Sequence, residues 1–365
     1  MSDGIAGTTG NAAPQPAVRF DAVVKRYGTV TAVDSVSFDI AQGTLVTLLG
    51  PSGCGKTTTL RLIAGLEQAT EGRILIGGKD VTQLSAAERD VSMVFQSYAL
   101  FPHMNVMENV SYGLKAMGLK KAEVESRAAA KLALVGLSGY EKRQPSELSG
   151  GQQQRVAVAR AIVLEPQVLL FDEPLSNLDA KLRRRVRDEI RGLQQELALT
   201  VVYVTHDQEE ALAVSDRIVV MNAARVAQDG TPRELYSAPN SRFVADFMGD
   251  ANLIDVAVRR HNGPVAEVEA GSLRLSLPHR DIPVGAAAIA VRPHAIMLST
   301  EAGASGGIKG VVVKSAYLGD HVEYTVKTSN PQAELFATDA GVDTILSAGT
   351  KVFVSFDLDK LVLVS

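Results

Sequence analysis

The sequence predicts an α/β fold with a mostly parallel sheet over residues 18–249, followed by a small all-β domain. Three short runs in the first part are almost wholly apolar: LVTLL at 45–49, VLLF at 168–171 and VVYVT at 201–205. Strands that are apolar on both faces are typical of a parallel sheet covered by helices, and helical patterns separate these runs. After residue 249, β-rich runs recur between Gly, Asp and Asn turns, at 311–313, 322–326, 352–354 and 361–364. Their spacing predicts a small barrel or sandwich.

The helical patterns divide the first part further. Residues 97–166 are predicted to form a helical subdomain inserted between the first and later strands, because 122–135 is rich in Ala and Lys and lacks strand alternation. A helix at about 180–197 carries apolar residues at helical spacing: Leu182, Val186, Ile190, Leu193 and Leu197. The predicted organisation is a disordered Gly/Ala/Pro tail at 1–17, an α/β domain at 18–249 and a β-rich domain at 250–365.

Composition excludes several classes of function. A net charge of −4 gives no electrostatic reason to expect nucleic acid as a partner. The run at 183–185, RRR, is predicted to be a solvated helix face balanced by Asp188, Glu189 and Glu196. The single cysteine, Cys54, excludes an internal disulfide and fits a reducing compartment. No apolar run approaches the roughly 18 residues of a membrane span, so we expect a cytoplasmic protein that meets a membrane only through a partner.

The segment GPSGCGKT at 50–57 carries the strongest chemical signal. It fits G-x-x-x-x-G-K-[ST], in which glycines let backbone N–H groups approach phosphate oxygens. Lys56 is expected to reach the β- and γ-phosphates, and the Thr57 hydroxyl to take a position on Mg²⁺. The motif follows a predicted strand and precedes an apolar helix, whose N-terminus favours an anion. The residues expected to contact the nucleotide here are Gly50, Pro51, Ser52, Gly53, Cys54, Gly55, Lys56, Thr57 and Thr58.

Two carboxylates end the second apolar run. Asp172 is predicted to hold Mg²⁺, mostly through water, because Mg²⁺ sheds its waters reluctantly. Glu173 is predicted to orient and polarise the attacking water, which in-line phosphoryl transfer requires. The third run is followed by HDQEEA at 206–211. Ligand sites of open α/β sheets lie at the carboxyl ends of the strands, so all three polar segments are expected to converge on one crevice.

Taken in order, these segments resemble a known family. Residues 18–249 carry GPSGCGKTT, VFQSYALFP with Gln96, LSGGQQQR at 148–155, LLFDEP, SNLD at 176–179 and VTHD with His206. This stretch resembles the ATP-binding subunit of an ABC transporter, which implies a P-loop NTPase cassette. The β-rich tail resembles the OB-like (TOBE) domain that follows the cassette in some bacterial importers. The resemblance therefore implies an ABC ATPase domain at 18–249 and a regulatory or dimerisation domain at 250–365.

The resemblance also implies roles for single residues. Gln96 matches the glutamine that senses Mg²⁺ and the attacking water, and His206 matches the switch histidine that contacts the γ-phosphate. Tyr27, in KRYG, matches the aromatic residue that stacks on adenine, the alternative being an ordinary tyrosine at a strand end. Asp179 matches the loop that crosses the dimer interface. ATP and Mg²⁺ are the implied substrate and metal, with Thr57, Gln96 and Asp172 around the metal.

The segment LSGGQ contains no acidic residue and no histidine that could catalyse hydrolysis. In the family this segment, called the signature, acts in trans. Two subunits form a head-to-tail dimer, and each of two ATP molecules lies between the P-loop of one subunit and the signature of the other. Ser149, Gly150, Gly151 and Gln152 are therefore expected to contact the partner's nucleotide, small residues allowing close backbone approach. The alternative is a glycine turn that merely starts the following helix.

The amino-acid sequence as a whole resembles those of ferric-iron import ATPases. Polyamine (spermidine or putrescine) and 2-aminoethylphosphonate systems share much of it and stay open as alternatives. Such an importer implies two permease subunits, a periplasmic solute-binding protein and a peripheral location at the cytoplasmic face of the bacterial inner membrane. His261, His279, His294 and His321 are expected to be ordinary surface residues rather than iron ligands. An ABC-type ATPase of DNA repair or translation is the competing class, which the single cassette and its short spacing disfavour.

Overall fold

The computed structural model describes residues 15–301, 307–342 and 344–365. The described residues form two compact units, which divide between residues 227 and 228. Most of the predicted tail, residues 1–14, lies outside the described residues. Ala17 is buried, and its N–H donates to the Ile40 carbonyl oxygen at 2.8 Å, so the first strand begins directly after it.

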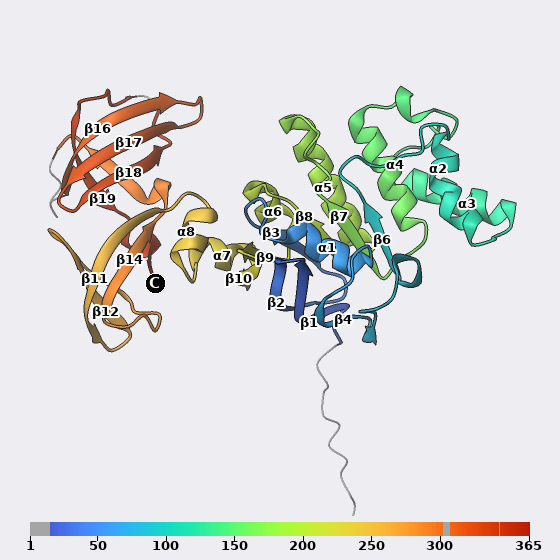
Figure 1. The fold of residues 1–365 in the computed structure, drawn as a ribbon. Helices are drawn as coiled ribbons and strands as arrows, with labels where there is room; N and C mark the ends of the chain where they lie inside the picture. The colour runs from blue at the N-terminus through green and yellow to red at the C-terminus, as the bar shows by residue number, and fades with distance from the viewer. Residues whose placement is uncertain (1–14, 302–306, 343) are drawn as a thin grey trace, which may run out of the picture. The chain divides into compact units, whose positions relative to one another are not determined.

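A six-stranded sheet forms the centre of the first unit (Figure 1). Its spatial order is β10 (Arg225–Gly230), β9 (Arg217–Asn222), β3 (Leu45–Leu49), β8 (Val201–Val204), β7 (Val168–Asp172) and β6 (Val91–Val94). The strands from β9 to β6 pair in parallel. Every residue of β3 and β8 is buried, as expected for strands covered on both faces. The carboxyl ends of β3, β8 and β7 therefore lie side by side.

A second, antiparallel sheet in this unit was not predicted from the sequence. Its order is β2 (Val30–Ile40), β1 (Val18–Tyr27), β4 (Glu71–Ile76) and β5 (Lys79–Asp80). Exposed and buried residues alternate along much of β2, so one face of the sheet is buried. Phe20 and Phe38 stack across the β1–β2 pair with ring centroids 4.7 Å apart.

Three helices form the predicted helical subdomain, grouped together beside the sheet (Figure 1). They are α2 (Val106–Ala116), α3 (Lys121–Leu134) and α4 (Gly150–Ile162), with a short 3₁₀ turn at Pro145–Glu147 before α4. Their apolar faces pack into one cluster that contains Val110, Leu114, Leu132 and Val156, all fully buried. The helices of the core are α1 (Lys56–Ala64), α5 (Ala180–Glu196) and α6 (Gln208–Val214), and a 3₁₀ turn lies at Ala86–Glu88.

The second unit begins with two short helices, α7 (Pro232–Ser237) and α8 (Arg242–Phe247), and continues as two five-stranded antiparallel sheets. One sheet contains β11 (Asn252–Asn262), β12 (Val265–Ala270), β13 (Leu273–Pro278), β14 (Gly285–Val291) and β20 (Leu361–Val364). The other contains β15 (Ile296–Ser299), β16 (Ile308–Tyr317), β17 (Val322–Ser329), β18 (Gln332–Asp339) and β19 (Lys351–Phe356). Residues of both sheets, among them Ile289 and Tyr324, share one core, which confirms the predicted all-β character.

No helix within the described residues is long and apolar enough to cross a bilayer.

Candidate functional site

The loop between β3 and α1 depends on glycine at two positions. Gly50 and Gly55 have φ angles of 155° and 105°, in the region that side chains disfavour. A Cβ at Gly50 would lie 2.2 Å from the Met221 carbonyl oxygen, and one at Gly55 would lie 2.4 Å from that of Ala32. No other residue fits either position without moving the backbone. A tight loop of this kind can bring its backbone N–H groups close to an anion when one binds.

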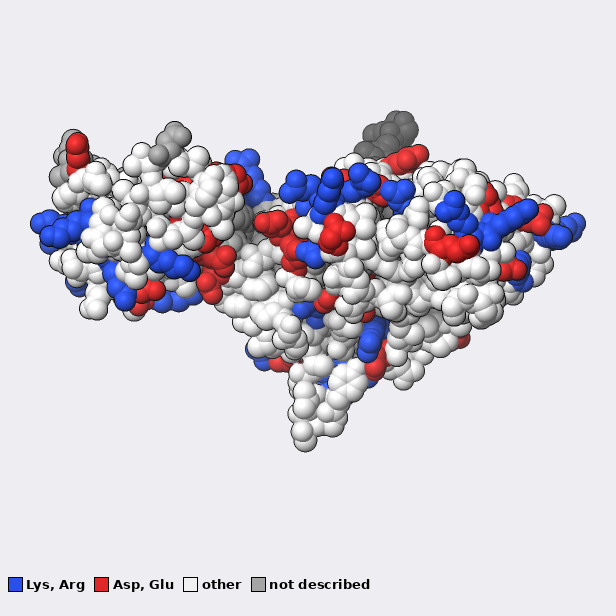
Figure 2. All heavy atoms as spheres, turned by 90° about the horizontal axis from the view of Figure 1, so that it is seen from above, with Lys and Arg blue, Asp and Glu red and all other residues white. Residues whose placement is uncertain are grey.

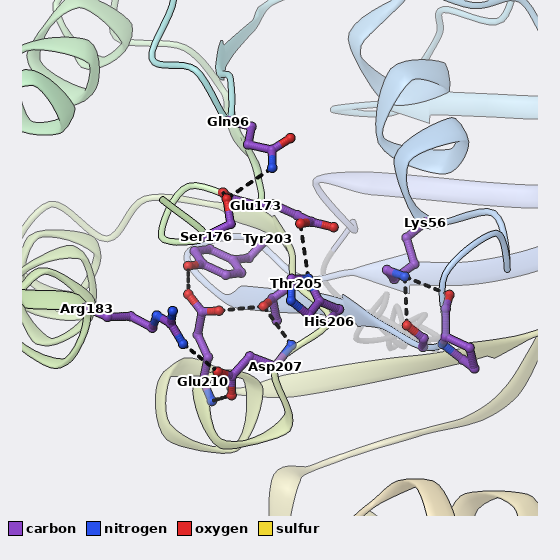
Figure 3. A network of polar contacts seen from close by, with 12 residues as sticks. Lys56, Gln96, Glu173, Ser176, Arg183, Tyr203, Thr205, His206, Asp207 and Glu210 are labelled. Carbon is purple, nitrogen blue, oxygen red and sulfur yellow. Dashed lines mark hydrogen bonds and ion pairs between the residues drawn. The ribbon is translucent and has the colours of Figure 1, made fainter. Parts of the chain in front are cut away.

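Lys56 places a positive charge in the same loop. It is the first residue of α1, only 6% exposed, and its Nζ donates to the carbonyl oxygens of Gly50 (2.7 Å) and Pro51 (2.9 Å) (Figure 3). Cys54, a residue of the loop itself, is buried, and burial raises the pKa of its thiol. A buried ammonium beside a helix N-terminus is an arrangement that attracts phosphate.

Two hard oxygen donors meet where α1 faces β7. Asp172 is the last residue of β7, and its carboxylate interacts with the Thr57 side chain, which lowers its pKa slightly against the effect of burial. Burial raises the pKa of Asp172, while the charge of Arg61 opposes that shift. Among the described residues no group of three or more His, Cys, Asp or Glu side chains could hold a metal ion. A hydroxyl and one carboxylate do fit Mg²⁺, which keeps several waters and takes substrate phosphates as its other ligands.

Glu173 and His206 come from neighbouring strand ends and point toward each other (Figure 3). The Nδ1 atom of His206 lies 3.1 Å from the Glu173 carboxylate, and the Glu173 N–H donates to the Val204 carbonyl oxygen at 3.0 Å. The Glu173 side chain is 24% exposed and that of His206 61%. A carboxylate and an imidazole held together at the carboxyl ends of the strands can bind and orient a water molecule beside them.

Gln96 follows β6 and is tied to the loop after Glu173. Its Nε2 donates to the Ser176 hydroxyl at 3.1 Å, and that hydroxyl donates to the Glu173 carbonyl oxygen at 3.0 Å. The Asn177 side chain donates to the Gln96 carbonyl oxygen at 3.1 Å, closing the contact from the other side. Three predicted segments, those of Gln96, Glu173 and Ser176, therefore form one connected group.

The residues of a polar network beside His206 were not predicted from the sequence as members of the site. The buried Glu210 carboxylate accepts hydrogen bonds from the hydroxyls of Tyr203 and Thr205 (Figure 3). Asp207 caps α6 by accepting from the Glu210 N–H at 3.0 Å, and Arg183 of α5 donates to Asp207 at 3.3 Å. The acidic run in HDQEEA is the sequence feature that indicates this network, but the partners of its carboxylates lie on two other elements, β8 and α5.

The signature residues lie at the start of α4. The Ser149 side chain is the N-cap and accepts from the Gln152 N–H, while the Gln152 side chain accepts from the Ser149 N–H at 2.9 Å. Ser149 is exposed and Gly151 buried. Cβ atoms at Gly150 and Gly151 would lie 3.2 and 3.1 Å from the side chains of Leu178 and Leu182, so these glycines also let α4 approach α5.

Two further predicted residues, Tyr27 and Asp179, are exposed. Tyr27 ends β1 in the antiparallel sheet and is 45% exposed, with the Lys25 ammonium 4.7 Å from its ring centroid. Burial of its hydroxyl end and a hydrogen bond to Glu67 raise the pKa of Tyr27. Asp179 caps α5 by accepting from the Leu182 N–H at 2.9 Å. An exposed aromatic face is available for stacking, and an exposed N-cap for contact with another molecule.

A glycine-rich loop between a buried strand and a helix, with carboxylates at the carboxyl end of another strand of the same sheet, defines a P-loop nucleoside triphosphatase. The inserted helical subdomain that begins α4 with LSGGQ places it among the ABC-type ATPases. The ABC transporter family model matches residues 33–176, and the TOBE domain model matches residues 289–364. The chain belongs to the family of ABC transporter ATP-binding proteins and is an ATPase of that family.

Relatives match over almost the whole chain. The Fe(3+) ions import ATP-binding protein FbpC of Brucella abortus (strain 2308) is 58% identical over 348 residues, covering 95% of this chain and 98% of that protein. The protein of the same name from Agrobacterium fabrum is 61% identical over 311 residues, covering 85% and 88%.

Solved structures of the family have the same cassette fold. The cbiO1 protein of Clostridium perfringens, part of the transporter complex cbiONQ, covers 60% of this chain and 90% of its own, with 28% identity and a TM-score of 0.57. The bacterial ABC transporter cassette MJ0796, solved as a dimer, covers 59% and 99%, with 32% identity and a TM-score of 0.53.

Proposed function

We propose that this chain is the ATP-hydrolysing subunit of an Fe(3+) importer. The supporting observation is the identity of 58% with a curated Fe(3+) import ATP-binding protein over 95% of this chain and 98% of that protein. The match thus extends through the second unit as well as the cassette. Iron is the transported solute of the complex, so no iron site on this subunit is required.

The proposed assembly is a head-to-tail homodimer bound to two permease subunits, which receive the solute from a periplasmic binding protein. The chain then lies peripherally at the cytoplasmic face of the inner membrane. The β-rich domain at 250–365 is assigned a regulatory or dimerisation role. This arrangement gives Ser149 and Asp179 partners, because both side chains are exposed at helix N-termini within their own chain.

Nucleotide binding in this proposal uses groups that the fold has already oriented. The backbone N–H groups of residues 50–58 and the ammonium of Lys56 hold the phosphates, and Tyr27 stacks on adenine. Thr57 and Asp172, with Gln96 near them, would hold Mg²⁺, which when bound neutralises charge on the β- and γ-phosphates. The contacts of Lys56 with two loop carbonyls are replaced by contacts with phosphate oxygens.

Hydrolysis is assigned to Glu173 and His206, which follow the neighbouring strands β7 and β8. Glu173 accepts a hydrogen bond from the attacking water and orients it in line with the γ-phosphate. His206, held 3.1 Å from that carboxylate, contacts the γ-phosphate and keeps Glu173 in place. Gln96 reports the state of the site to the helical subdomain through the Ser176 hydroxyl. The Ser149 hydroxyl and the N-terminus of α4 of the opposite subunit complete the site.

Uptake of radiolabelled Fe(3+) by the host cell tests the proposed solute. Deletion of the gene should abolish high-affinity, energy-dependent Fe(3+) uptake, and the wild-type gene should restore it. The Lys56→Ala gene should not, because the phosphate-binding ammonium is lost. Spermidine and 2-aminoethylphosphonate uptake serve as controls and should be unchanged. Loss of either of these with normal Fe(3+) uptake would contradict iron as the solute.

A further inference from the structure

A cleft between the helical subdomain and α5 has no role in the proposed reaction. Its volume is about 370 Å³, and its walls come from the end of α3, from α4 and from α5. Binding sites for small molecules have volumes of about 300–1,000 Å³. The size of this cleft therefore suits a small molecule rather than a peptide helix.

The walls of the cleft are mainly apolar. Leu134 and Val158 line it from the helical subdomain, and Val186, Ile190 and Leu193 line it from α5. Val158, Val186 and Ile190 are each at most 5% exposed and belong to the core that joins α4 and α5 to the sheet. Fixed apolar walls on both sides provide a surface for a hydrocarbon body.

Gly192 keeps one side of the cleft open. It lies inside α5, where glycine costs about 1 kcal/mol relative to alanine. A Cβ at this position would meet no heavy atom within 4 Å, so neither packing nor a special backbone angle requires glycine. The missing side chain leaves space beside the apolar wall.

Gln154 supplies a specific polar group. The residue lines the cleft, is 0% exposed, and neither its Oε1 nor its Nε2 has a hydrogen-bond partner among the described residues. A buried amide without partners costs free energy that a bound donor and acceptor would recover. A primary carboxamide offers both groups on one edge, matching the amide of Gln154.

The charges around the cleft favour an uncharged ligand. Arg155 and Glu189, both in its wall, form a two-point ion pair in which Nε and Oε2 are 2.8 Å apart. Each charge is therefore already compensated by the other. Glu196 adds a further carboxylate to the lining and disfavours an anion.

We propose that this cleft binds a small uncharged amphiphile, with a hydrocarbon body against the α5 wall and a primary carboxamide paired with Gln154. The ligand would contact α4, which begins at the signature residue Ser149, and α5, which begins after Asp179. Binding therefore favours one relative position of these two helices. Both helices start at segments assigned to the dimer interface, so occupancy would also change ATP turnover.

Ligand-observed NMR titration of the full-length protein without nucleotide tests the site directly. Hydrocinnamamide should bind the wild type about tenfold more tightly than propylbenzene, the effect of two hydrogen bonds. Gln154→Leu, similar in size but apolar, should reverse this preference, because the carboxamide of the probe then loses its water without gaining a partner. Gly192→Phe should fill the cleft and bind neither, whereas Gln195→Phe, exposed on the same helix outside the cleft, should behave as wild type.

Three outcomes would overturn the proposal. Failure of hydrocinnamamide to bind the wild type removes the site, and wild-type binding to Gly192→Phe places the probe elsewhere. Equal affinities of the two probes for the wild type would mean that Gln154 is already satisfied by ordered water and does not select an amide. The titration needs no nucleotide, permease or iron, so its result is independent of the proposed transport function.

Discussion

Glu173 combines a strained backbone with the position expected of the water-orienting carboxylate. Its φ angle of 44° lies in the left-handed region, which costs about 1–3 kcal/mol for a residue with a side chain. The strain turns the chain sharply after β7, so that Asp172 meets Thr57 while Glu173 meets His206. Adjacent carboxylates thereby receive different partners and different proposed tasks.

Replacing Glu173 by Gln should separate ATP binding from hydrolysis. We expect kcat to fall by roughly 10²–10⁴-fold, because the amide no longer accepts a proton from water. ATP affinity should stay near that of the wild type, and a nucleotide-bound dimer should accumulate. Turnover assays with size-exclusion chromatography measure both effects, and hydrolysis at the wild-type rate would refute the assigned role. Exposed Glu147→Gln is the matched control.

Cys54 should react slowly with thiol reagents in the folded protein. Its thiol is 4% exposed, and burial raises its pKa, so little thiolate is accessible at neutral pH. We expect labelling at least about tenfold slower than in denaturant, because local opening must come first. The chain has one cysteine, so colorimetric labelling reports this thiol alone. Equal rates in the two states would contradict the buried position.

At the scale of elements, the turn from β8 into α6 is held by a buried carboxylate. Glu210 is 5% exposed and accepts from Tyr203 of β8 and from Thr205 in the turn. Burial raises the pKa of Glu210, with Asp207 adding to the shift and the two hydrogen bonds and Arg183 opposing it. This turn positions His206, which is itself exposed.

The raised pKa of Glu210 makes the free energy of unfolding depend on pH. Because its pKa is raised in the folded state, its stabilising contribution is complete below the ordinary value of about 4.3 and is lost as the pH rises through the folded pKa. Between about pH 4 and pH 7, the free energy of unfolding of the wild type should therefore fall relative to that of Glu210→Gln. Denaturant titrations check this, with Glu209→Gln, its exposed neighbour, as control. Parallel pH profiles for wild type and Glu210→Gln would count against it.

At the scale of the whole molecule, the proposed head-to-tail dimer gives the signature segment a partner site. Ser149 is exposed, and within the described residues the only hydrogen bond of its side chain caps its own helix. The glycines after it pack toward Leu178 and Leu182, which fixes α4 against α5 but leaves the serine hydroxyl at the surface. A head-to-tail dimer would place that hydroxyl at the nucleotide of the other subunit.

Mixing two inactive variants tests this arrangement. Lys56→Ala lacks a working P-loop and Ser149→Arg lacks a working signature, so each homodimer should be inactive. In a head-to-tail heterodimer, one site joins the intact P-loop of one subunit to the intact signature of the other. Random pairing should therefore restore about a quarter of the wild-type sites. ATPase assays on the mixture measure this, and mixtures as inactive as the separate variants would argue against the trans site.

The helices and strands that could be predicted were those whose pattern of apolar residues is uninterrupted. The buried run at 45–49 coincides with β3, and the apolar spacing from Leu182 onward coincides with α5. The antiparallel sheet of β1, β2 and β4 could not be predicted in the same way. Register shifts between Phe20 and Val23 and between Asp21 and Val24 interrupt the alternation of β1, so the period of two is lost locally.

The site likewise contains residues that could be predicted from the sequence and contacts that could not. Lys56, Thr57, Asp172, Glu173 and His206 follow predicted strands and could be placed together from the sequence, because carboxyl ends of parallel strands share one edge. The contacts of Gln96 with Ser176 and of Arg183 with Asp207 could not, since each joins side chains from separate elements. Sequence spacing contains no information on such distances.

By itself the sequence determined the class of this protein, because its motifs require particular residue types at fixed spacings along the chain. Glycines at 50 and 55, a lysine at 56 and the LSGGQ segment suffice for that. The tertiary structure alone decided which groups are paired, buried or open. It set Glu173 against His206, buried the Glu210 carboxylate and left the Gln154 amide, beside a cleft, without a hydrogen-bond partner in the described part of the chain. Hydrogen bonds and charges act over a few ångströms, and only folding brings residues distant in sequence within that range.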